Sequence, residues 1–310
     1  MRVLVAGASG TLGGPLVRQL VRAGHQVSGI TRSSRGADRI AQTGGSAVTV
    51  DIMDRDALLR AVDGEQFEAV IHEATALAKA TARHSDMAQT NALRTQGTAH
   101  LIAAAQATGA RRFLTQSIVF GYGYTDHGTT VLIEDSPFGV LRGDAFDPHV
   151  EAMVSTEHQA MHTEGIEGIA LRYGLLYGAD IDNVVRMLRK RMLPVVRGGG
   201  EIPFIHHEDA AAATVAALER GQAGKAYNIV DDTPATFRQL VTGIADARQA
   251  PRPLVVPQWV LAMAAPYGKA LFAGISMRVS NARAQHELSW KPMYPSISDG
   301  IRAGQAYEDR

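Results

Sequence analysis

The sequence contains no cysteine, which excludes disulfides, zinc–thiolate sites and thiol nucleophiles. Lysine is scarce, with five among 310 residues, although arginine brings the basic side chains to 31, which balance 31 acidic ones. A formal net charge of zero argues against a nucleic-acid partner, because proteins that bind nucleic acid need a concentrated basic surface. We expect the partner to be a small-molecule substrate.

Long hydrophobic runs are missing as well. No apolar stretch reaches the roughly 20 residues that a membrane-spanning helix needs. The chain opens with MRVLVAG, which has the pattern of a strand rather than that of a signal peptide. These absences predict a cytoplasmic protein with no membrane partner, and a homodimer is the assembly we consider.

Short β-branched runs instead alternate with helix-length segments from the first residue. RVLVAG, QVSGITR, AVTVD, AVIHEA, RRFLTQS and GIALRYG are typical of strands. Because these runs are apolar on both faces, they predict an α/β fold, a Rossmann-type doubly wound parallel sheet covered by helices. After residue 178 the alternation weakens. We therefore expect a dinucleotide-binding domain of residues 1–177 plus 205–231, and a smaller, mostly helical substrate lobe of residues 178–204 plus 232–310.

The first predicted strand leads directly into GASGTLG and then into a helix. In this segment Gly7 permits a tight turn, Gly10 a close approach of the backbone and Gly13 a close contact between helix and strand. Backbone N–H groups of such a turn bind a pyrophosphate at the helix N-terminus, and Ser9 and Thr11 can add hydroxyl donors. The alternative is a plain strand–helix turn.

The end of the second predicted strand indicates which dinucleotide binds. An acidic residue there would bind the ribose 2′-hydroxyl and repel a 2′-phosphate. This chain has TRSSR, in which Arg32 and Arg35 can pair with a phosphate and Ser33 lies between them. The sequence therefore favours NADP over NAD, and the alternative is a solvated basic loop.

With these residues placed, the chain resembles the extended short-chain dehydrogenases/reductases of the NAD(P)-dependent epimerase/dehydratase superfamily. The resemblance covers nearly the whole chain and rests on GASGTLG, VDIMD, IHEATA, TNALRTQGT, RRFLTQSIVFGYG, LRYGLLYG, PFIHHEDAA and SNARAQHELSWKP. It implies contacts to the dinucleotide from further residues, namely Leu12, Asp51, Ile52, Ala74, Thr75, Asn91 and Tyr173.

The chain departs from this family at the catalytic helix. The family uses a Ser together with a Tyr and a Lys in YxxxK spacing, where the Tyr transfers a proton and the Lys lowers its pKa. Counting back from Glu157, which resembles an acidic residue of the family, places Met153 at the Lys and His149 at the Tyr. None of the eight tyrosines has a Lys four residues later. The sequence thus predicts an enzyme without this dyad.

Four residues are candidates for the catalytic work. His149 could be a general acid or base, which would make the rate bend near pH 6–7, or it could be a surface histidine. Ser117 could bind a substrate carbonyl, although another register places Ile118 at the family's Ser. Tyr122 and Tyr124 could present their phenols to the nicotinamide, or merely line a pocket. Met153 is expected to pack the helix onto the sheet.

His206, His207, Glu208 and Asp209 look like a metal cluster, but adjacent residues of an extended segment point to opposite faces. We expect no metal there, and expect Asp209 to cap the helix that follows.

Three functions remain open. The first is an NADP-dependent oxidoreductase that acts on a small, fairly apolar carbonyl or alcohol with a non-standard proton donor. The second is a non-redox epimerase, isomerase or lyase that uses bound NAD(P). The third is a regulatory protein that binds NADP without turnover. We rank them in this order, because a protein of the third kind has no need of a polar, aromatic cleft.

Overall fold

The apolar runs lie side by side in one parallel sheet. The computed structural model of the chain describes residues 1–77 and 81–306. Seven strands form the sheet, all parallel, in the order β11-β7-β5-β4-β1-β2-β3. Their bounds are β1 Arg2–Ala6, β2 Gln26–Thr31, β3 Ser46–Thr49, β4 Ala69–His72, β5 Arg112–Ile118, β7 Glu167–Tyr173 and β11 Lys225–Ile229. The Rossmann-type doubly wound sheet predicted from the sequence is confirmed.

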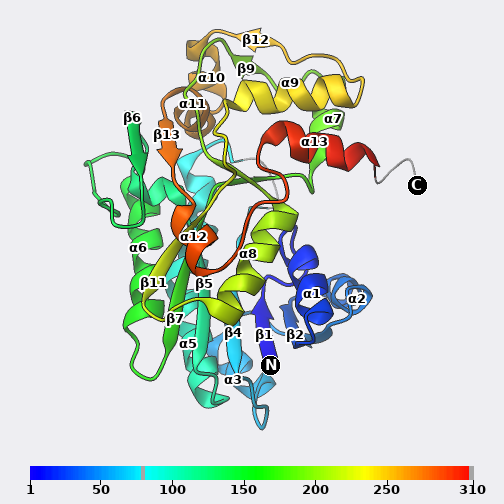
Figure 1. Cartoon of the computed structure of the whole chain (residues 1–310), viewed down its shortest axis with the longest axis vertical. Helices are drawn as coiled ribbons and strands as arrows, with labels where there is room; N and C mark the ends of the chain where they lie inside the picture. Colours follow the sequence, from blue (N-terminus) through cyan, green and yellow to red (C-terminus); the bar gives the residue numbers. More distant parts are fainter. Residues whose placement is uncertain (78–80, 307–310) are drawn as a thin grey trace.

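Helices cover both faces of this sheet (Figure 1). One face carries α1 (Gly13–Arg22), α2 (Ser34–Gln42) and α8 (His207–Arg220), and the other carries α3 (Arg55–Ala61), α5 (Thr98–Ala107) and α6 (Asp147–His162). Strand β1 shows why helices have to pack on both faces of the sheet. Val3 and Val5 are buried in the core under the first helices, whereas Leu4 and Ala6 are buried under the second. A strand without a polar face is stable only between two layers.

The strand order reverses between β1 and β4. The end of β1 pairs with the end of β4, where Ala6 lies opposite His72, and His72 in turn lies opposite Thr115 of β5. The loops that follow these strands therefore emerge together at one edge of the sheet. Ligands of open α/β sheets bind at this switch point.

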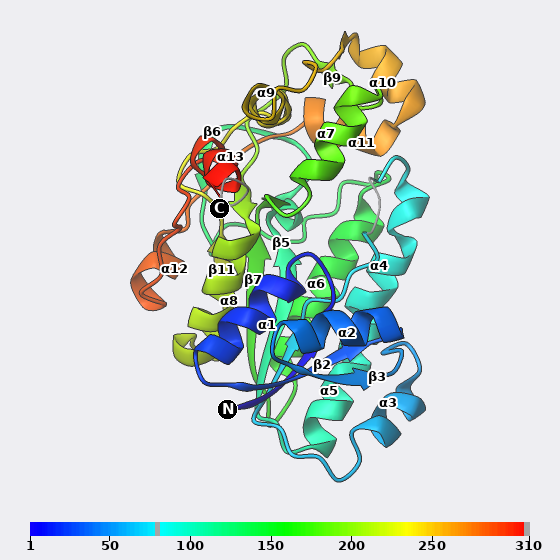
Figure 2. The same cartoon turned by 90° about the vertical axis from the view of Figure 1, so that its right-hand side faces the viewer.

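A second group of helices lies beyond the carboxyl ends of the strands (Figures 1 and 2). It contains α7 (Ile181–Arg189), α9 (Phe237–Ala247), α10 (Gln258–Ala264), α11 (Pro266–Ala273) and α13 (Ile297–Ala306). Two short parallel pairs accompany them, β8 (Leu175–Tyr177) with β10 (Phe204–His206), and β9 (Val195–Val196) with β12 (Val255–Val256). Helices α7, α9, α11 and α13 pack in a hydrophobic core that also includes Val119, Phe120 and Met153 of the first part. The mostly helical C-terminal lobe is confirmed by the five helices.

The two parts are connected by more contacts between distant segments of the chain than the sequence suggests. Strand β13 (Ser276–Val279) pairs with β6 (Asp126–Leu132), which follows β5 in the chain. After α12 (Ala282–Glu287), Leu288 and Trp290 are buried in the same core as Val3 and Val5. The division at residues 177, 205 and 231 stays a prediction.

The expected cap at Asp209 is wrong. Helix α8 begins at His207, and its N-cap is His206, whose Nδ1 accepts a hydrogen bond from the N–H of Glu208. The Asp209 carboxylate instead accepts hydrogen bonds from the N–H groups of Met293 and Tyr294, so it ties the C-terminal segment to α8. Within residues 1–77 and 81–306, no helix is both long and apolar enough to span a bilayer.

Candidate functional site

The loop between β1 and α1 has the shape of a phosphate cradle. Gly7 has a φ of +88°, and a Cβ on it would lie 2.6 Å from the carbonyl carbon of Glu73. A Cβ on Gly13 would collide with the carbonyl oxygen of Gly7. The chain can therefore close this turn only with glycine at both positions.

The same loop offers free donors. In the part of the chain that the structure describes, the N–H groups of Ser9, Thr11, Leu12 and Gly13 donate no hydrogen bond, whereas the N–H of Gly10 bonds to the oxygen of Gly7. No side chain caps α1 either. A helix N-terminus with unpaired N–H groups favours an anion, so these residues fit the pyrophosphate of a dinucleotide.

Arg32, Ser33 and Arg35 follow β2 as expected and are all exposed. The Ser33 hydroxyl caps α2 by accepting a hydrogen bond from the N–H of Gly36. The Arg32 Nη1 lies 3.9 Å from the Asp51 Oδ2, a loose contact on the surface. Both guanidinium groups thus remain available to a phosphate at the end of β2.

The other predicted cofactor contacts surround the switch point. Ile52 is buried, and its carbonyl accepts a hydrogen bond from His100, while Thr75 is exposed. The N–H of Ala74 donates to the Nδ1 of His72, so the Nε2–H of this imidazole donates to the Leu93 carbonyl. Burial lowers the pKa of His72 to about 4, so it is a neutral structural residue.

Tyr173 lies at the end of β7 but is 2% exposed, and its hydroxyl is engaged. It donates to Glu73 Oε1 at 2.8 Å and lies 2.7 Å from the Thr214 hydroxyl. Burial raises the pKa of Glu73 to about 8, which keeps this carboxyl largely protonated beside the phosphate loop. The placement favours a structural role for Tyr173 over direct contact with a dinucleotide.

Helix α6 is fixed to the sheet by a buried ion pair. Glu157 accepts two hydrogen bonds from Arg172 of β7, at 2.9 and 2.8 Å. One face of the helix is buried against the sheet, and this face includes His149, Met153, Thr156 and Glu157. His149 and Met153 share this face one turn apart, and Met153 is fully buried, as predicted.

His149 is not the surface histidine that we considered, because only 2% of it is exposed. Its Nδ1 lies 2.9 Å from the Asn91 Nδ2, and its Nε2 lies 3.1 Å from the His84 Nδ1. An amide N–H can only donate, so Nδ1 accepts and the proton of His149 is on Nε2, directed at His84.

This environment corrects the expected pH dependence. Burial, together with the neighbouring His84 and Arg94, lowers the pKa of His149 to about 4. The imidazole is therefore neutral at pH 7, and the bend near pH 6–7 that we expected from it would move to about pH 4. At neutral pH the group can orient and donate a hydrogen bond, but it is a poor proton donor.

Ser117 lies in β5 and is 1% exposed. Its Oγ has no hydrogen-bond partner among the described residues. Because side chains alternate along a strand, Ser117 faces the same side as Thr115, whose hydroxyl bonds to Thr156 of α6. An unpaired hydroxyl on the α6 side of the sheet is available to a substrate oxygen.

The two candidate phenols lie in different surroundings. Tyr122 is at the end of the 3₁₀ turn η3 (Val119–Tyr122), where its hydroxyl donates to Asn228 and accepts from Arg172. Tyr124 is half-buried and stacks on Phe146, with 4.1 Å between ring centroids. Burial raises the pKa of both phenols above the usual range. Tyr122 is thus committed to a structural network, and Tyr124 is the freer of the two.

Sequence reasoning missed part of this site. Tyr124, Phe146 and His149 form an aromatic cluster with His84 of η1 (His84–Met87) and Tyr267 of α11. Helix α4 (Ala88–Ala92) continues into the π-helical turn η2 (Leu93–Gly97), which carries the buried Arg94. Irregular π turns are frequent at functional sites, but no periodicity in the sequence reveals one.

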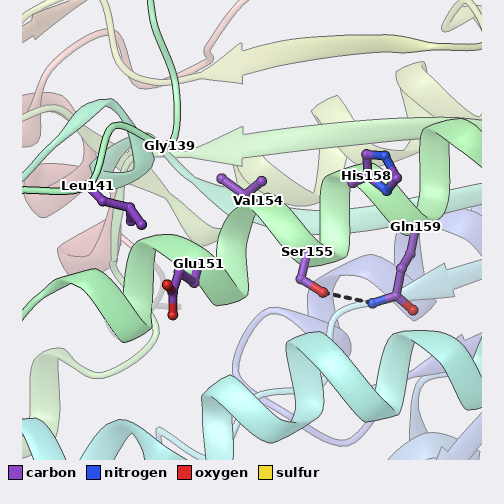
Figure 3. A pocket seen from close by; sticks show the side chains of 7 residues that line it. All are labelled: Gly139, Leu141, Glu151, Val154, Ser155, His158 and Gln159. Atoms are coloured by element: carbon purple, nitrogen blue, oxygen red, sulfur yellow. Dashed lines mark hydrogen bonds between the residues drawn. The ribbon is translucent and has the colours of Figure 1, made fainter.

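A surface hollow on α6 lies away from this site. It has a volume of about 320 Å³ and is lined by Gly139, Leu141, Glu151, Val154, Ser155, His158 and Gln159 (Figure 3). These helix residues alternate with those of the buried face, so the hollow is on the outward face of α6. Within the described ranges, no three His, Asp or Glu side chains form a metal-binding group.

The comparisons with known proteins agree with this geometry. Residues 3–230 match the NAD dependent epimerase/dehydratase family. The chain is 38% identical to a 3-diazoavenalumate denitrifying reductase of Streptomyces sp, over 97% of this chain and 99% of that one. It is 30% identical to a 2-alkyl-3-oxoalkanoate reductase of Stenotrophomonas maltophilia, over 81% and 77% of the two chains.

Among solved structures, a UDP-glucose 4-epimerase of Thermotoga maritima with UDP-glucose has a TM-score of 0.78 at 20% identity, covering 100% and 99% of the two chains. A human epimerase family protein with NADPH has a TM-score of 0.77 at 19% identity, covering 98% of each chain. These likenesses concern the fold. The chain therefore belongs to the NAD dependent epimerase/dehydratase family, and it is an NAD(P)-dependent oxidoreductase or epimerase-like enzyme.

Proposed function

We propose that this enzyme is an NADPH-dependent reductase of a small, fairly apolar carbonyl compound, and that it works without a Tyr–Lys dyad. The observation that carries the proposal is the buried face of α6. His149 and Met153 lie on this face, at the positions where the resemblance in sequence would put the family's dyad, and His149 is hydrogen-bonded to Asn91 and His84. The reductase names of the relatives support reduction over epimerisation.

The cofactor would be held at the switch point. The free N–H groups of the loop after β1 would bind the pyrophosphate, and Arg32 and Arg35 the 2′-phosphate. Bound NADPH supplies a hydride. The side chains of this chain then have to orient the acceptor and provide a proton.

Ser117 and Tyr124 are suited to these two tasks. The unpaired Ser117 hydroxyl would donate to the substrate oxygen and orient it. A phenol is protonated at neutral pH, and burial, which raises the pKa of Tyr124, keeps it so. Tyr124 would pass this proton to the substrate oxygen, which becomes a strongly basic alkoxide as the hydride arrives. His149, neutral and held by Asn91, would orient the surrounding side chains instead of titrating.

The experiment follows NADPH and NADH oxidation with a panel of aryl and alkyl ketones and aldehydes, and measures the affinity of both cofactors. We expect NADP(H) to bind more tightly, and Arg32→Ala to weaken NADP(H) about 10- to 100-fold with little effect on NAD(H). Equal affinities for the two cofactors in the parent enzyme would contradict the 2′-phosphate site. No turnover of any carbonyl would contradict the reaction.

A second candidate is the reductive loss of N₂ from a diazo compound. It is favoured by the Streptomyces relative, which matches nearly the full length of both chains and is named for this substrate type. An arenediazonium carbon can accept the hydride of NADPH while its C–N bond breaks and N₂ leaves, so this step needs no proton donor at a carbonyl oxygen, which suits an α6 face without an acid. Tyr124→Phe separates the candidates, because it should slow carbonyl reduction about 10²–10⁴-fold and leave N₂ release within a few-fold.

A further inference from the structure

Arg94 is a buried cation without a counter-charge. It is 2% exposed, and its Nε and Nη1 have no hydrogen-bond partner within the described ranges. Among these residues, the groups whose charge raises the pKa of Arg94 are the hydroxyls of Tyr124 and Tyr267, and no carboxylate is one of them. A charge is buried at great cost unless it is paired, so such a group needs an explanation.

The other deeply buried arginine shows what a structural arginine looks like in this fold. Arg172 is 6% exposed, and Glu157 pairs with it through both carboxylate oxygens. Its Nη1 also donates to the Tyr122 hydroxyl and to the carbonyl of Glu134. The buried guanidinium of Arg172 thus has an ion pair and further hydrogen bonds, whereas the Nε and Nη1 of Arg94 lack such partners among the described residues.

Arg94 lies beside the candidate catalytic groups. Its charge acts on Tyr124 and Tyr267, whose rings meet edge to face, and on His149. The Oδ1 of Asn91, whose amide nitrogen bonds to His149, is buried and lacks a partner as well, as does the Oγ of Ser117 in β5. Unpaired polar atoms of Arg94 and Asn91 thus lie near His149, next to the rings of Tyr124, Phe146 and Tyr267.

We propose that Arg94 binds a carboxylate of the substrate, so that the carbonyl compound that the enzyme reduces is also a carboxylic acid with an apolar or aromatic body. The guanidinium would neutralise the carboxylate, and the hydroxyls of Tyr124 and Tyr267 can add hydrogen bonds to it. The aromatic rings would cover the apolar body of the acid. This inference rests on the proposed function for the reaction, but it concerns binding alone.

The test compares each acid with its own amide, which has the same shape and no charge. The probes are trans-cinnamate with cinnamamide and octanoate with octanamide, titrated calorimetrically into the enzyme saturated with NADP. We expect at least one acid to bind at least tenfold more tightly than its amide. Comparison of the aromatic pair with the aliphatic pair then shows whether the site prefers an aromatic or an aliphatic substrate. If neither acid binds more tightly than its amide, the proposal is wrong.

Two variants localise the effect. Arg94→Met keeps the length of the side chain without its charge, and should weaken binding of the acid about 10- to 100-fold while NADP binding stays unchanged. Arg94→Lys should retain part of the affinity. Arg32→Ala is the matched control, because it should weaken NADP and leave the acid unaffected once NADP is saturating. Failure of the carboxylate site and failure of the cofactor site are therefore distinguishable.

Thermal unfolding gives a readout independent of ligands. A structural arginine would lower the Tm when it is replaced, whereas an unpaired buried cation should not. We expect the Tm of ligand-free Arg94→Met to equal or exceed that of the parent. A clear fall in Tm, or failure to fold, would show that Arg94 holds the fold together and would overturn the proposal.

Discussion

Tyr122 and Tyr124 are separated by one glycine, yet their hydroxyls serve different partners. The Tyr122 hydroxyl bonds to Asn228 and Arg172, which come from β11 and β7. Removing it with Tyr122→Phe leaves the buried Oδ1 of Asn228 without a partner. It also takes away one hydrogen bond of Arg172, whose Nη1 keeps the one to Glu134. We expect the free energy of unfolding to fall by about 1–3 kcal/mol in urea denaturation, with kcat within a few-fold of the parent.

Tyr124→Phe should show the reverse. Its ring would keep the stacking on Phe146, so stability should change by less than about 1 kcal/mol, while carbonyl reduction falls. Steady-state rates and urea denaturation of both variants decide the matter. A variant of Tyr122 that loses activity at unchanged stability would reverse the two assignments.

Single residues were the hardest part of the site to predict. Ser117, Tyr124 and His149 could be named because motifs of the family surround them. Arg94 and Tyr267 could not, because their importance comes from neighbours on distant elements. Tyr267 lies on α11, 118 residues after His149, and yet the centroid of its ring is 5.7 Å from that of the imidazole. No local pattern encodes such a contact.

At the scale of elements, the effect of replacing a glycine in the turn from β1 into α1 depends on which glycine is replaced. A Cβ on Gly13 would collide with the backbone of Gly7 and Ala8, whereas a Cβ on the next residue, Gly14, would meet nothing within 4 Å. We therefore expect Gly13→Ala to distort the loop and to weaken dinucleotide binding more than tenfold, as measured by fluorescence titration.

Gly14→Ala is the matched control one position along the same helix. It should leave dinucleotide binding unchanged and stabilise α1 by up to about 1 kcal/mol, since alanine has the higher helix propensity. Equal affinities in the two variants would mean that the loop adapts to a side chain, which would remove the steric argument for Gly13.

Elements were more predictable from the sequence than the contacts between them. Six of the seven strands of the main sheet were predicted, because buried parallel strands are continuous apolar runs, whereas β11 was not. The pairing of β6 with β13 was not, since 144 residues separate Leu132 from Ser276 and both strands are short and partly polar. Pairing over such a distance is set by the surrounding fold and not by local composition.

For the whole molecule, buried titratable groups predict how stability depends on pH. Burial lowers the pKa of His72, His149 and His206 to about 4, from 6.5 in the unfolded chain. The stability that these neutral histidines contribute to the folded state is fully present above pH 6.5 and is lost as the pH falls towards 4. Burial raises the pKa of Glu73 and Asp231 to about 8, so their contribution is lost as the pH rises from about 4 to 8. Stability should therefore be greatest between about pH 6 and 7.

Two variants test each side of this maximum. His206→Asn keeps a capping side chain on α8 but removes an imidazole, so its stability relative to the parent should rise by about 1.4 kcal/mol per unit as the pH falls below 6.5. The stability of Asp231→Asn relative to the parent should rise as the pH increases from 4 to 8. Urea denaturation across pH 4–8 measures both, and parallel profiles for parent and variants would contradict these assignments.

The burial of Trp290 beside β1 has a consequence for how the protein is made. The first strand leaves the ribosome early, but the core that it shares with Leu288 and Trp290 lacks these side chains until some 285 further residues have been translated. A nascent chain of about 230 residues would contain every strand of the main sheet and still expose apolar surface on one face. Folding of the dinucleotide-binding half should thus wait until residues 288–290 have left the ribosome, and the interval before this is the time when the nascent chain is most exposed to chaperones and proteases.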